Sequence, residues 1–372
     1  MRAVHATSFA WIDPAALPRR QFLYGQHLIR GHVAVLCAPG GVGKSSLTMV
    51  DALAMVTGRD LIGSTPHAGP LTAWLFNLED PADEMQRRIT AAALRYGIEP
   101  ADIEGALYLD SGRDQPLTIA RQDRHGTEII APVVDELVAE LQQRGIDVLV
   151  IDPFVSSHSV PENDNGGIDA VAKEWARVAH RANCAIELVH HVRKSGEAEI
   201  TAESARGAGA LINAARAVRV LNRMTPDEAA RAGLESHRGY FRVGLDKTNL
   251  TPAPEAASWF RIASVELANG DNVGVVEPWA WPDPFADITV ADLRRVQQAI
   301  DGKALRQNVQ ARDWVGHTIA EVLALDASDT HAKNRIKSML ATWLKTGALV
   351  VGETKDEKGN RRPIVEVGTW AQ

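Results

Sequence analysis

Hydrophobic positions follow two alternating patterns over the first two-thirds of the chain. Short uninterrupted apolar runs predict buried strands, because a strand covered on both faces of a sheet has no polar side. Apolar residues at every third or fourth position between these runs predict helices. The expected strands are residues 33–37, 71–78, 106–109, 117–119, 146–151, 185–189, 217–221, 240–245 and 259–267, and the expected helices are residues 45–55, 82–96, 128–144 and 168–182. This alternation predicts an α/β domain with a mainly parallel sheet covered on both faces.

The pattern changes near residue 280, where the sequence WAWPDPFA at residues 279–286 has the Trp and Pro content of a linker. Three helical patterns follow, and then a hairpin with turn residues near its centre. These elements are residues 290–300, 311–325, 332–346 and 348–367. Three helices followed by a hairpin indicate a winged helix-turn-helix domain. We therefore expect a leader packed on the core at 1–30, a main domain at 31–280, a linker at 281–286 and a winged-helix domain at 287–372.

Composition limits the class of protein. The chain has 372 residues, of which 45% are hydrophobic and 23% charged, as in an ordinary globular protein. Its formal net charge of -7 excludes a globally basic coat for nucleic acid. Cys37 and Cys184 both lie in apolar runs and suggest no disulfide framework, which favours a reducing compartment. No signal core begins the chain, and no run approaches the ~18 apolar residues of a membrane span. We expect a cytoplasmic protein without a membrane partner.

The turn after the first buried strand carries the most specific chemical pattern. Its sequence APGGVGKS, residues 38–45, matches G-x-x-x-x-G-K-[ST], with Ala38 at the first Gly position. The glycines let backbone N–H groups converge on phosphate oxygens, and the following helix adds its positive N-terminal end. In such a loop the lysine reaches the β- and γ-phosphates and the serine hydroxyl completes the Mg²⁺ shell. The predicted ligands of ATP are Pro39, Gly40, Gly41, Val42, Gly43, Lys44, Ser45 and Ser46.

Polar residues end three other buried strands and predict the rest of the site. Asp152 fits the Walker-B acid that holds Mg²⁺ together with Ser45, although a plain turn aspartate is the alternative. No acid follows Asp152, so Glu79 is the candidate for activating water, unless it only stabilises a helix N-terminus. His190 and His191 follow the expected strand at 185–189, where an imidazole can touch the γ-phosphate or simply lie partly buried. Adjacent strand residues point to opposite faces, which argues against a zinc site.

Several segments, taken in order, carry a resemblance. They are APGGVGKSSL, LFNLEDP, VLVIDPF, ELVHHVRK, SARGAGALINAAR and FRVGLDKTN. Together they resemble the RepA-type hexameric helicase ATPases of plasmids and the related RecA-like AAA-family ATPases of prophages. The resemblance covers roughly residues 20–265. It implies a RecA-like P-loop fold and a hexameric ring with ATP sites between subunits. Ala38 and the C-terminal module depart from the family pattern, and the added module puts helicase activity in question.

The resemblance also assigns roles to individual residues. The catalytic set that it implies is Lys44, Glu79, Asp152, His190, His191, Arg216 and Lys247. Glu79 is then the base that activates water, and the two histidines sense the γ-phosphate. Arg216 matches an arginine finger that serves the ATP of the neighbouring subunit, and Lys247 falls near the position of a second such cation. Arg219 competes with Arg216 for the finger role. Alternatively, Arg216 is only a surface arginine that pairs with a nearby acid.

Two basic groups are candidates for binding DNA. The polar loop at 192–209 contains Arg193, Lys194 and Arg206, which could follow single-stranded DNA through a central channel. The alternative is a solvated flexible loop. The C-terminal module places Lys333, Arg335 and Lys337 on its third helix and Arg361 and Arg362 on its hairpin, which suits duplex DNA. The alternative there is a protein-docking domain with a solvated charged face.

These observations lead to one main hypothesis and two alternatives. The main hypothesis is an ATP-hydrolysing ring motor that acts on DNA, used as a replicative helicase of plasmid or phage type. The first alternative is an ATP-dependent, DNA-binding regulatory switch that does not unwind. The second is a non-enzymatic adaptor, against which Lys44, Ser45, Glu79 and Asp152 argue. ATP and Mg²⁺ are the expected ligands, and DNA and further copies of the chain are the expected partners.

Overall fold

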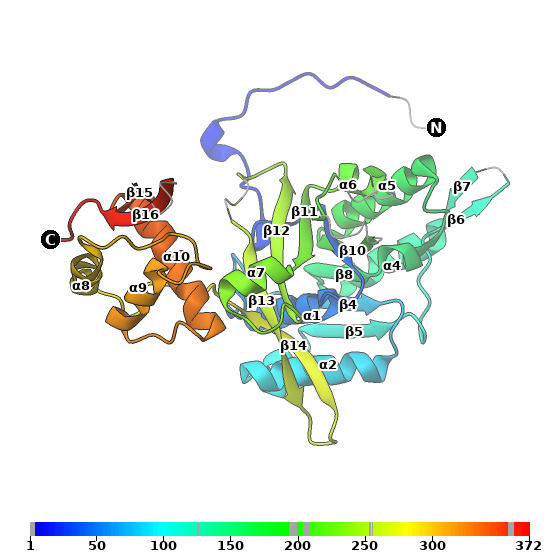
Figure 1. Cartoon of the computed structure of the whole chain (residues 1–372). Coiled ribbons are helices and arrows are strands. Elements are labelled where there is room, and N and C mark those ends of the chain that lie inside the picture. Colours follow the sequence, from blue (N-terminus) through cyan, green and yellow to red (C-terminus); the bar gives the residue numbers. More distant parts are fainter. Residues whose placement is uncertain are drawn as a thin grey trace. The chain divides into compact units, whose positions relative to one another are not determined.

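The computed structural model describes residues 4–124, 126–192, 199–203, 209–252, 254, 256–355 and 361–372 (Figure 1). It divides into two compact units. The first contains residues 1–222 and 242–278, and the second contains residues 223–241 and 279–372. The second unit therefore includes a segment, residues 223–241, that lies between two strands of the main sheet in the sequence.

The first unit is built on a nine-stranded sheet with the order β14-β13-β12-β11-β3-β10-β8-β4-β5. Its strands are β3 (Val33–Pro39), β4 (Ala73–Asn77), β5 (Leu107–Ser111), β8 (Val148–Asp152), β10 (Ala185–Val192), β11 (Ala217–Arg223), β12 (Tyr240–Thr248), β13 (Ser258–Glu266) and β14 (Asn272–Pro278). The five strand pairs that run from β11 through β3, β10, β8 and β4 to β5 are parallel, whereas β13 and β14 pair antiparallel. The prediction of an α/β domain with a mainly parallel sheet is confirmed.

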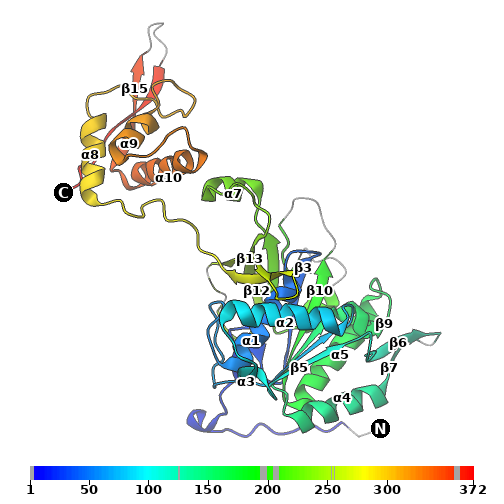
Figure 2. The same ribbon diagram turned by 90° about the horizontal axis from the view of Figure 1, so that it is seen from below.

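Helices cover both faces of this sheet (Figures 1 and 2). They are α1 (Lys44–Thr57), α2 (Ala82–Tyr96), α3 (Pro100–Ile103), α4 (Ala131–Arg144), α5 (Asn165–Ala182) and α6 (Gly209–Ala214). Val33, Val35 and Cys37 of β3 point into a buried cluster with Trp175 of α5, and α4 and α6 join the same cluster. Helices α1 and α2 pack on the opposite face. Among the described residues, no helix is long and apolar enough to cross a bilayer.

Some elements differ from the expected ones. Residues 117–119 lie outside the strands, and β6 (Ala120–Asp123), β7 (Gly126–Ile129) and β9 (His158–Ser159) form a small separate sheet. The helix expected at 128–144 begins at Ala131, because a proline in its first turn fits a helix start and not a helix interior. Helix α5 begins before the expected residue 168, because the Asp164 carboxylate accepts the Gly167 N–H at 3.0 Å as an N-cap.

The N-terminal segment packs on the sheet only through its last part. Strands β1 (Phe22–Tyr24) and β2 (Leu28–Ile29) pair antiparallel, and most of their side chains are buried. Residues 4–21 are exposed and form only the short 3-10 helix η1 (Pro14–Ala16). Figures 1 and 2 draw this blue segment extended and outside the packed layers.

The second unit contains helices and one hairpin. Its elements are α7 (Pro226–Ala232), α8 (Val290–Ile300), α9 (Val315–Leu323), α10 (Thr330–Thr346), β15 (Leu349–Lys355) and β16 (Arg361–Val367). Trp314, Met339, Trp343 and Val365 share its buried core. Helix α7 packs against α10, where the Asn334 amide donates to the Ala230 carbonyl. Three helices and a hairpin are present, as expected, but their assignment as a DNA-binding winged helix remains a prediction.

Candidate functional site

The glycine-rich turn between β3 and α1 forms one wall of a large cavity. Gly41 and Gly43 have φ values of 66° and 112°, in the left-handed region that favours glycine. The cavity has a volume of about 680 Å³, which is in the range of small-molecule sites. Gly41, Gly43 and the first residues of α1 line one side, and Asn272–Gly274 of the β13–β14 hairpin line another. The loop therefore opens onto a space that can hold a nucleotide.

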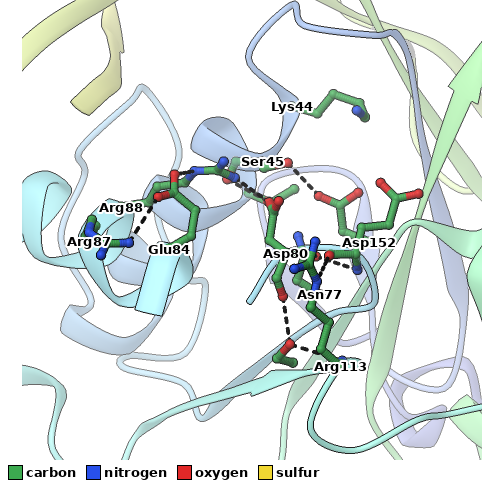
Figure 3. A network of polar contacts seen from close by, with 12 residues as sticks. Lys44, Ser45, Asn77, Asp80, Glu84, Arg87, Arg88, Arg113 and Asp152 are labelled. Atoms are coloured by element: carbon green, nitrogen blue, oxygen red, sulfur yellow. Dashed lines mark hydrogen bonds and ion pairs between the residues drawn. The ribbon is translucent and has the colours of Figure 1, made fainter. Parts of the chain in front are cut away.

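The ends of four parallel strands meet beside this loop. Asn77 of β4 is in register with Asp152 of β8, and His191 of β10 is in register with Ala38 of β3. The Ser45 hydroxyl donates a hydrogen bond to Asp152 Oδ2 at 2.8 Å (Figure 3). The two residues predicted to hold Mg²⁺ thus lie together. A hydroxyl and a carboxylate are oxygen ligands that suit this ion, so the side chains fit it.

Lys44 and His191 lie next to each other at the same edge. Lys44 Nζ is 3.5 Å from His191 Nδ1, and His191 Nε2 is 4.0 Å from Asp152 Oδ1. Burial lowers the pKa of Lys44, while Asp152 and Glu79 act in the opposite direction. Burial and then the Lys44 charge lower the pKa of His191 below its usual value of about 6.5. A neutral imidazole therefore faces the ammonium group near pH 7.

His190 lies on the other face of the same strand, as the alternation of side chains requires. It is buried, and it lines a small cavity of about 10 Å³ with Phe154, His158 and Leu211. Burial, together with His191, lowers the pKa of His190 to about 4. The structure thus places His191 at the phosphate loop and His190 in the core under α6.

The turn that carries Glu79 is held by two residues that the sequence analysis did not single out. The Asn77 side-chain oxygen accepts the backbone N–H groups of Glu79 at 2.9 Å and Asp80 at 2.7 Å. Arg113 Nε donates to the Glu79 carbonyl at 2.7 Å. The Glu79 side chain is exposed, and its charge acts on Lys44. The signal for Asn77 was its place two residues before Glu79, which is the spacing of an Asx turn.

Helix α2 and the β13–β14 hairpin form the outer wall of the cavity. Arg88 binds Asp80 at 2.7 Å and Glu84 at 2.8 Å (Figure 3). Arg87 pairs with Asp271 of the hairpin at 3.1 Å. The Ser46 hydroxyl donates to the Gly274 carbonyl at 3.1 Å and accepts the Val276 N–H at 3.0 Å. Ser46, predicted to bind nucleotide, thus has its hydroxyl engaged with β14.

Comparison with known proteins adds a family to this geometry. Residues 2–197 match the family described as AAA domain, and this match covers more than half of the 372 residues. The chain belongs to this AAA domain family. The AAA domain match includes the phosphate loop, the Glu79 turn, Asp152 and His191. Family membership therefore supports nucleotide binding at this edge of the sheet.

Two solved structures resemble the AAA domain chain at low sequence identity. One is described as "Crystal structure of the RadB recombinase", with 13% identity, a TM-score of 0.40, and coverage of 63% of this chain and 89% of that one. The other is described as "ATPase Domain of G40P", with 14% identity, a TM-score of 0.43, and coverage of 66% and 84%. The family assignment therefore rests on the match to residues 2–197.

Two predicted site residues lie beyond the AAA domain match and far from the phosphate loop. The backbone N–H of Arg216 donates to the Val33 carbonyl at 2.9 Å, so this exposed arginine lies at the start of β3 rather than its end. Lys247 Nζ donates to the Ile212 carbonyl at 2.8 Å. Burial and then the charge of Arg216 lower the pKa of Lys247. Both cations thus lie near the N-terminal ends of the parallel strands, whereas their own phosphate loop lies at the C-terminal ends.

Arg219, the competing finger candidate, is enclosed in the core. Its guanidinium binds Asp51 of α1 at 2.8 Å and Glu187 of β10 at 2.8 Å, and His27 lies 3.8 Å from the latter. Burial opposes the charge of Arg219, but the two carboxylates raise its pKa overall. His27, Asp51 and Glu187 also have the spacing of metal ligands. The guanidinium of Arg219 already neutralises these carboxylates in place of a metal ion. Because both ion pairs hold it inside its own core, Arg219 is not available to a neighbouring subunit.

The structure describes part of the predicted DNA-binding set. Arg193, Lys194 and Arg206 lie outside the described residues. Lys337 is exposed and Lys333 half-buried on α10, and Arg361 and Arg362 are exposed on β16. Arg361 pairs with Glu353 at 3.1 Å. Arg335 instead donates to the Pro284 carbonyl at 2.9 Å and to the Ala286 carbonyl, so it anchors the segment before α8.

Proposed function

We propose that this AAA domain protein is an ATP-hydrolysing, RecA-like ring motor that acts on DNA. The separation of Arg216 from the phosphate loop carries the proposal. The loop follows the last residue of β3, whereas the backbone N–H of Arg216 is bonded to Val33, the first residue of β3. Seven extended residues span roughly 20 Å, so a side chain at one end does not reach phosphates bound at the other. A second subunit that supplies Arg216 would complete the site.

The residues of the phosphate loop and of the neighbouring strand ends share the proposed chemistry. The loop N–H groups and Lys44 bind the phosphates, and Ser45 and Asp152 hold Mg²⁺. The bound ion would neutralise charge on the β- and γ-phosphate oxygens. Glu79 positions and deprotonates the attacking water. His191, neutral and 3.5 Å from Lys44, is placed to respond to the γ-phosphate.

The proposed use is that of a replicative helicase of plasmid or phage type, with the subunits in a hexameric ring around single-stranded DNA. An ATP-dependent regulatory switch without unwinding is the second candidate. The second unit favours this alternative, because three helices and a hairpin with exposed Lys337, Arg361 and Arg362 suit the binding of duplex DNA. Both candidates share the same ATP site and differ in what hydrolysis drives.

One set of measurements separates the two candidates. A helicase should show ATPase activity stimulated by single-stranded DNA and should displace a strand from a forked duplex. A switch should bind DNA in an ATP-dependent way without strand displacement. Absence of ATP hydrolysis in the assembled protein, with and without DNA, would remove both.

The second unit can be tested separately through its basic side chains. Reversing Lys333, Lys337, Arg361 and Arg362 to Glu should weaken duplex binding and flatten its salt dependence, because fewer counterions are released. Deleting residues 287–372 should do the same while leaving a folded ATPase. Reversal of Lys303 and Arg312, which are exposed between α8 and α9, is the matched control. Unchanged affinity and salt slope in both test variants would indicate a protein-docking unit.

A further inference from the structure

The N-terminal segment exposes large apolar side chains that its own chain does not cover. Phe9 is 85% exposed and Trp11 80% exposed, and their rings lie edge-on to each other with centroids 6.4 Å apart. Ile12 and Leu17 are each 53% exposed. Within the described structure, residues 4–12 have no backbone hydrogen bond to another described residue. Several exposed aromatic and aliphatic residues in one short segment indicate a protein-interaction site.

A matching surface lies at the β5 edge of the main sheet. A cavity of about 550 Å³, which we call the β5 pocket, is formed by β4, β5 and α4. Its aromatic lining consists of Trp74, Phe76 and Tyr108. Trp74 and Phe76 stack with centroids 5.5 Å apart. Strand β5 ends the order of the nine strands and, among the described strands, pairs only with β4. The pocket therefore borders a sheet edge with free backbone groups.

The segment and the pocket are complementary in geometry. Residues 8–12 read SFAWI, with the aromatic and β-branched residues that favour strands. In an extended chain Phe9 and Trp11 point to the same side and Ile12 to the other. Tyr108 and Asp110 alternate in the same way on β5 and both line the pocket. A strand added beside β5 would thus place both aromatic rings over the pocket, as in recognition by β-augmentation.

The length of the segment allows it to reach another subunit. The chain between Phe9 and Phe22 spans roughly 43 Å when extended at about 3.3 Å per residue. The first unit contains about 260 residues, which corresponds to a compact body roughly 45 Å across. We propose that residues 8–12 of one subunit add as a strand to β5 of a neighbouring copy, with Phe9 and Trp11 in its β5 pocket. This inference rests on the assembly that the proposed function requires.

The first test measures assembly by sedimentation with ATP and Mg²⁺. The double variant Phe9→Ala with Trp11→Ala should raise the dissociation constant of the assembly at least about tenfold, since large aromatic anchors dominate interfaces. Leu17→Ala, equally apolar but outside residues 8–12, is the matched control and should change it little. Val133→Glu, on the pocket wall in α4, should weaken assembly as the double variant does. Binding of ATP to each isolated variant reports that the phosphate site is folded.

The second test distinguishes a neighbouring copy from the same chain. Cys37 and Cys184 are buried, so introduced thiols react selectively with a short bismaleimide. Chains with Ser8→Cys, which keeps both aromatic anchors, are mixed with chains carrying Gln115→Cys, an exposed residue at the pocket. Linked dimers in the mixture support the inference. Linkage only within a chain that carries both cysteines would overturn it, as would unchanged assembly of the double variant. A wild-type chain that stays monomeric would overturn the ring assembly as well.

Discussion

At the scale of single residues, Lys44 and Glu79 should separate ATP binding from turnover. Lys44 lies in the phosphate loop beside Asp152 and His191, so Lys44→Ala should lose both tight ATP binding and hydrolysis. Glu79 extends from a turn beside the loop and is proposed to act only on water. Glu79→Gln should therefore bind ATP normally and turn over at least ~100-fold more slowly. Turnover close to that of the wild type in Glu79→Gln would remove Glu79 as the base.

A buried histidine should make the stability of the first unit depend on pH. His158 Nδ1 accepts the Val160 N–H at 3.2 Å, which requires a neutral ring, and burial lowers the pKa of His158 to about 4. Below about pH 6.5 the unfolded chain protonates this histidine while the folded protein does not. The stability that is present above about pH 6.5 is therefore lost as the pH falls toward 4. The loss at pH 5 relative to pH 8 should be about 2 kcal/mol of unfolding free energy from this residue.

The variant His158→Asn isolates this contribution. Its side-chain oxygen can still accept the Val160 N–H, but it has no proton to gain. Denaturant unfolding at pH 8 and pH 5 should show a smaller loss in the variant, by about 2 kcal/mol. His67→Asn, which alters an exposed histidine, is the control. The same pH difference in His158→Asn and in the wild type would contradict the prediction.

The sequence predicted the residues whose position follows from a motif or a strand end. Ser45 and Asp152 meet at 2.8 Å because a loop and a strand terminus fix them. It did not predict that Ser46 binds β14 or that Arg335 binds the carbonyls of residues 284 and 286. Those partners lie far away in the sequence, and no local pattern specifies them.

At the scale of elements, too, the sequence predicts what a local pattern specifies and misses what depends on distant partners. Buried strands of a parallel sheet are apolar on both faces, so β3, β4, β8 and β10 stand out in the sequence. Strand β14 was missed because its position depends on distant partners. Tyr96 of α2 donates to the Val276 carbonyl at 2.7 Å, and Arg95 pairs with Glu277. Only the folded chain brings α2 and β14 together.

The turn after β4 provides a prediction for one element. Asn77→Ala removes the acceptor of two backbone N–H groups, so the turn should loosen and displace Glu79. Turnover should fall roughly tenfold, because small errors in the position of a catalytic group are costly. ATP affinity should change little, since the phosphate loop is untouched. Asn77→Ser keeps a side-chain acceptor and should recover part of the turnover. Equal losses in the two variants, or a parallel loss of ATP affinity, would count against this role.

At the scale of the whole molecule, the two ends of the parallel strands have different roles in the proposed assembly. The phosphate loop and Asp152 lie at the C-terminal ends of these strands, and Arg216 and Lys247 lie near the N-terminal ends. The sequence resemblance placed Arg216 and Arg219 in competition. The ion pairs of Arg219 with Asp51 and Glu187 resolve it, because a buried and doubly paired guanidinium cannot leave its own subunit. A local sequence pattern does not distinguish Arg216, just before β11, from Arg219, three residues later on that strand.

Mixing two inactive variants tests whether Arg216 acts across the subunit boundary. Arg216→Ala should bind ATP but hydrolyse it slowly, because arginine fingers contribute roughly 10³–10⁵ in rate in well-studied cases. Lys44→Ala should be inactive for a different reason, since it lacks the phosphate contact. When the two variants exchange subunits, some boundaries pair an intact phosphate loop with an intact Arg216. Those boundaries should recover part of the ATPase activity, which neither variant shows alone.

The mixing experiment has internal controls for the alternatives. Mixtures of Lys44→Ala with Glu79→Gln should recover no activity, because both changes affect residues of one subunit's phosphate edge. Arg223→Ala, at the end of β11, should keep its own activity and serves as the control for a mutated arginine. Sedimentation of differently labelled chains establishes that the variants assemble together. If co-assembled Arg216→Ala and Lys44→Ala subunits recover nothing, or if Arg216→Ala alone is fully active, then Arg216 does not complete the neighbouring site.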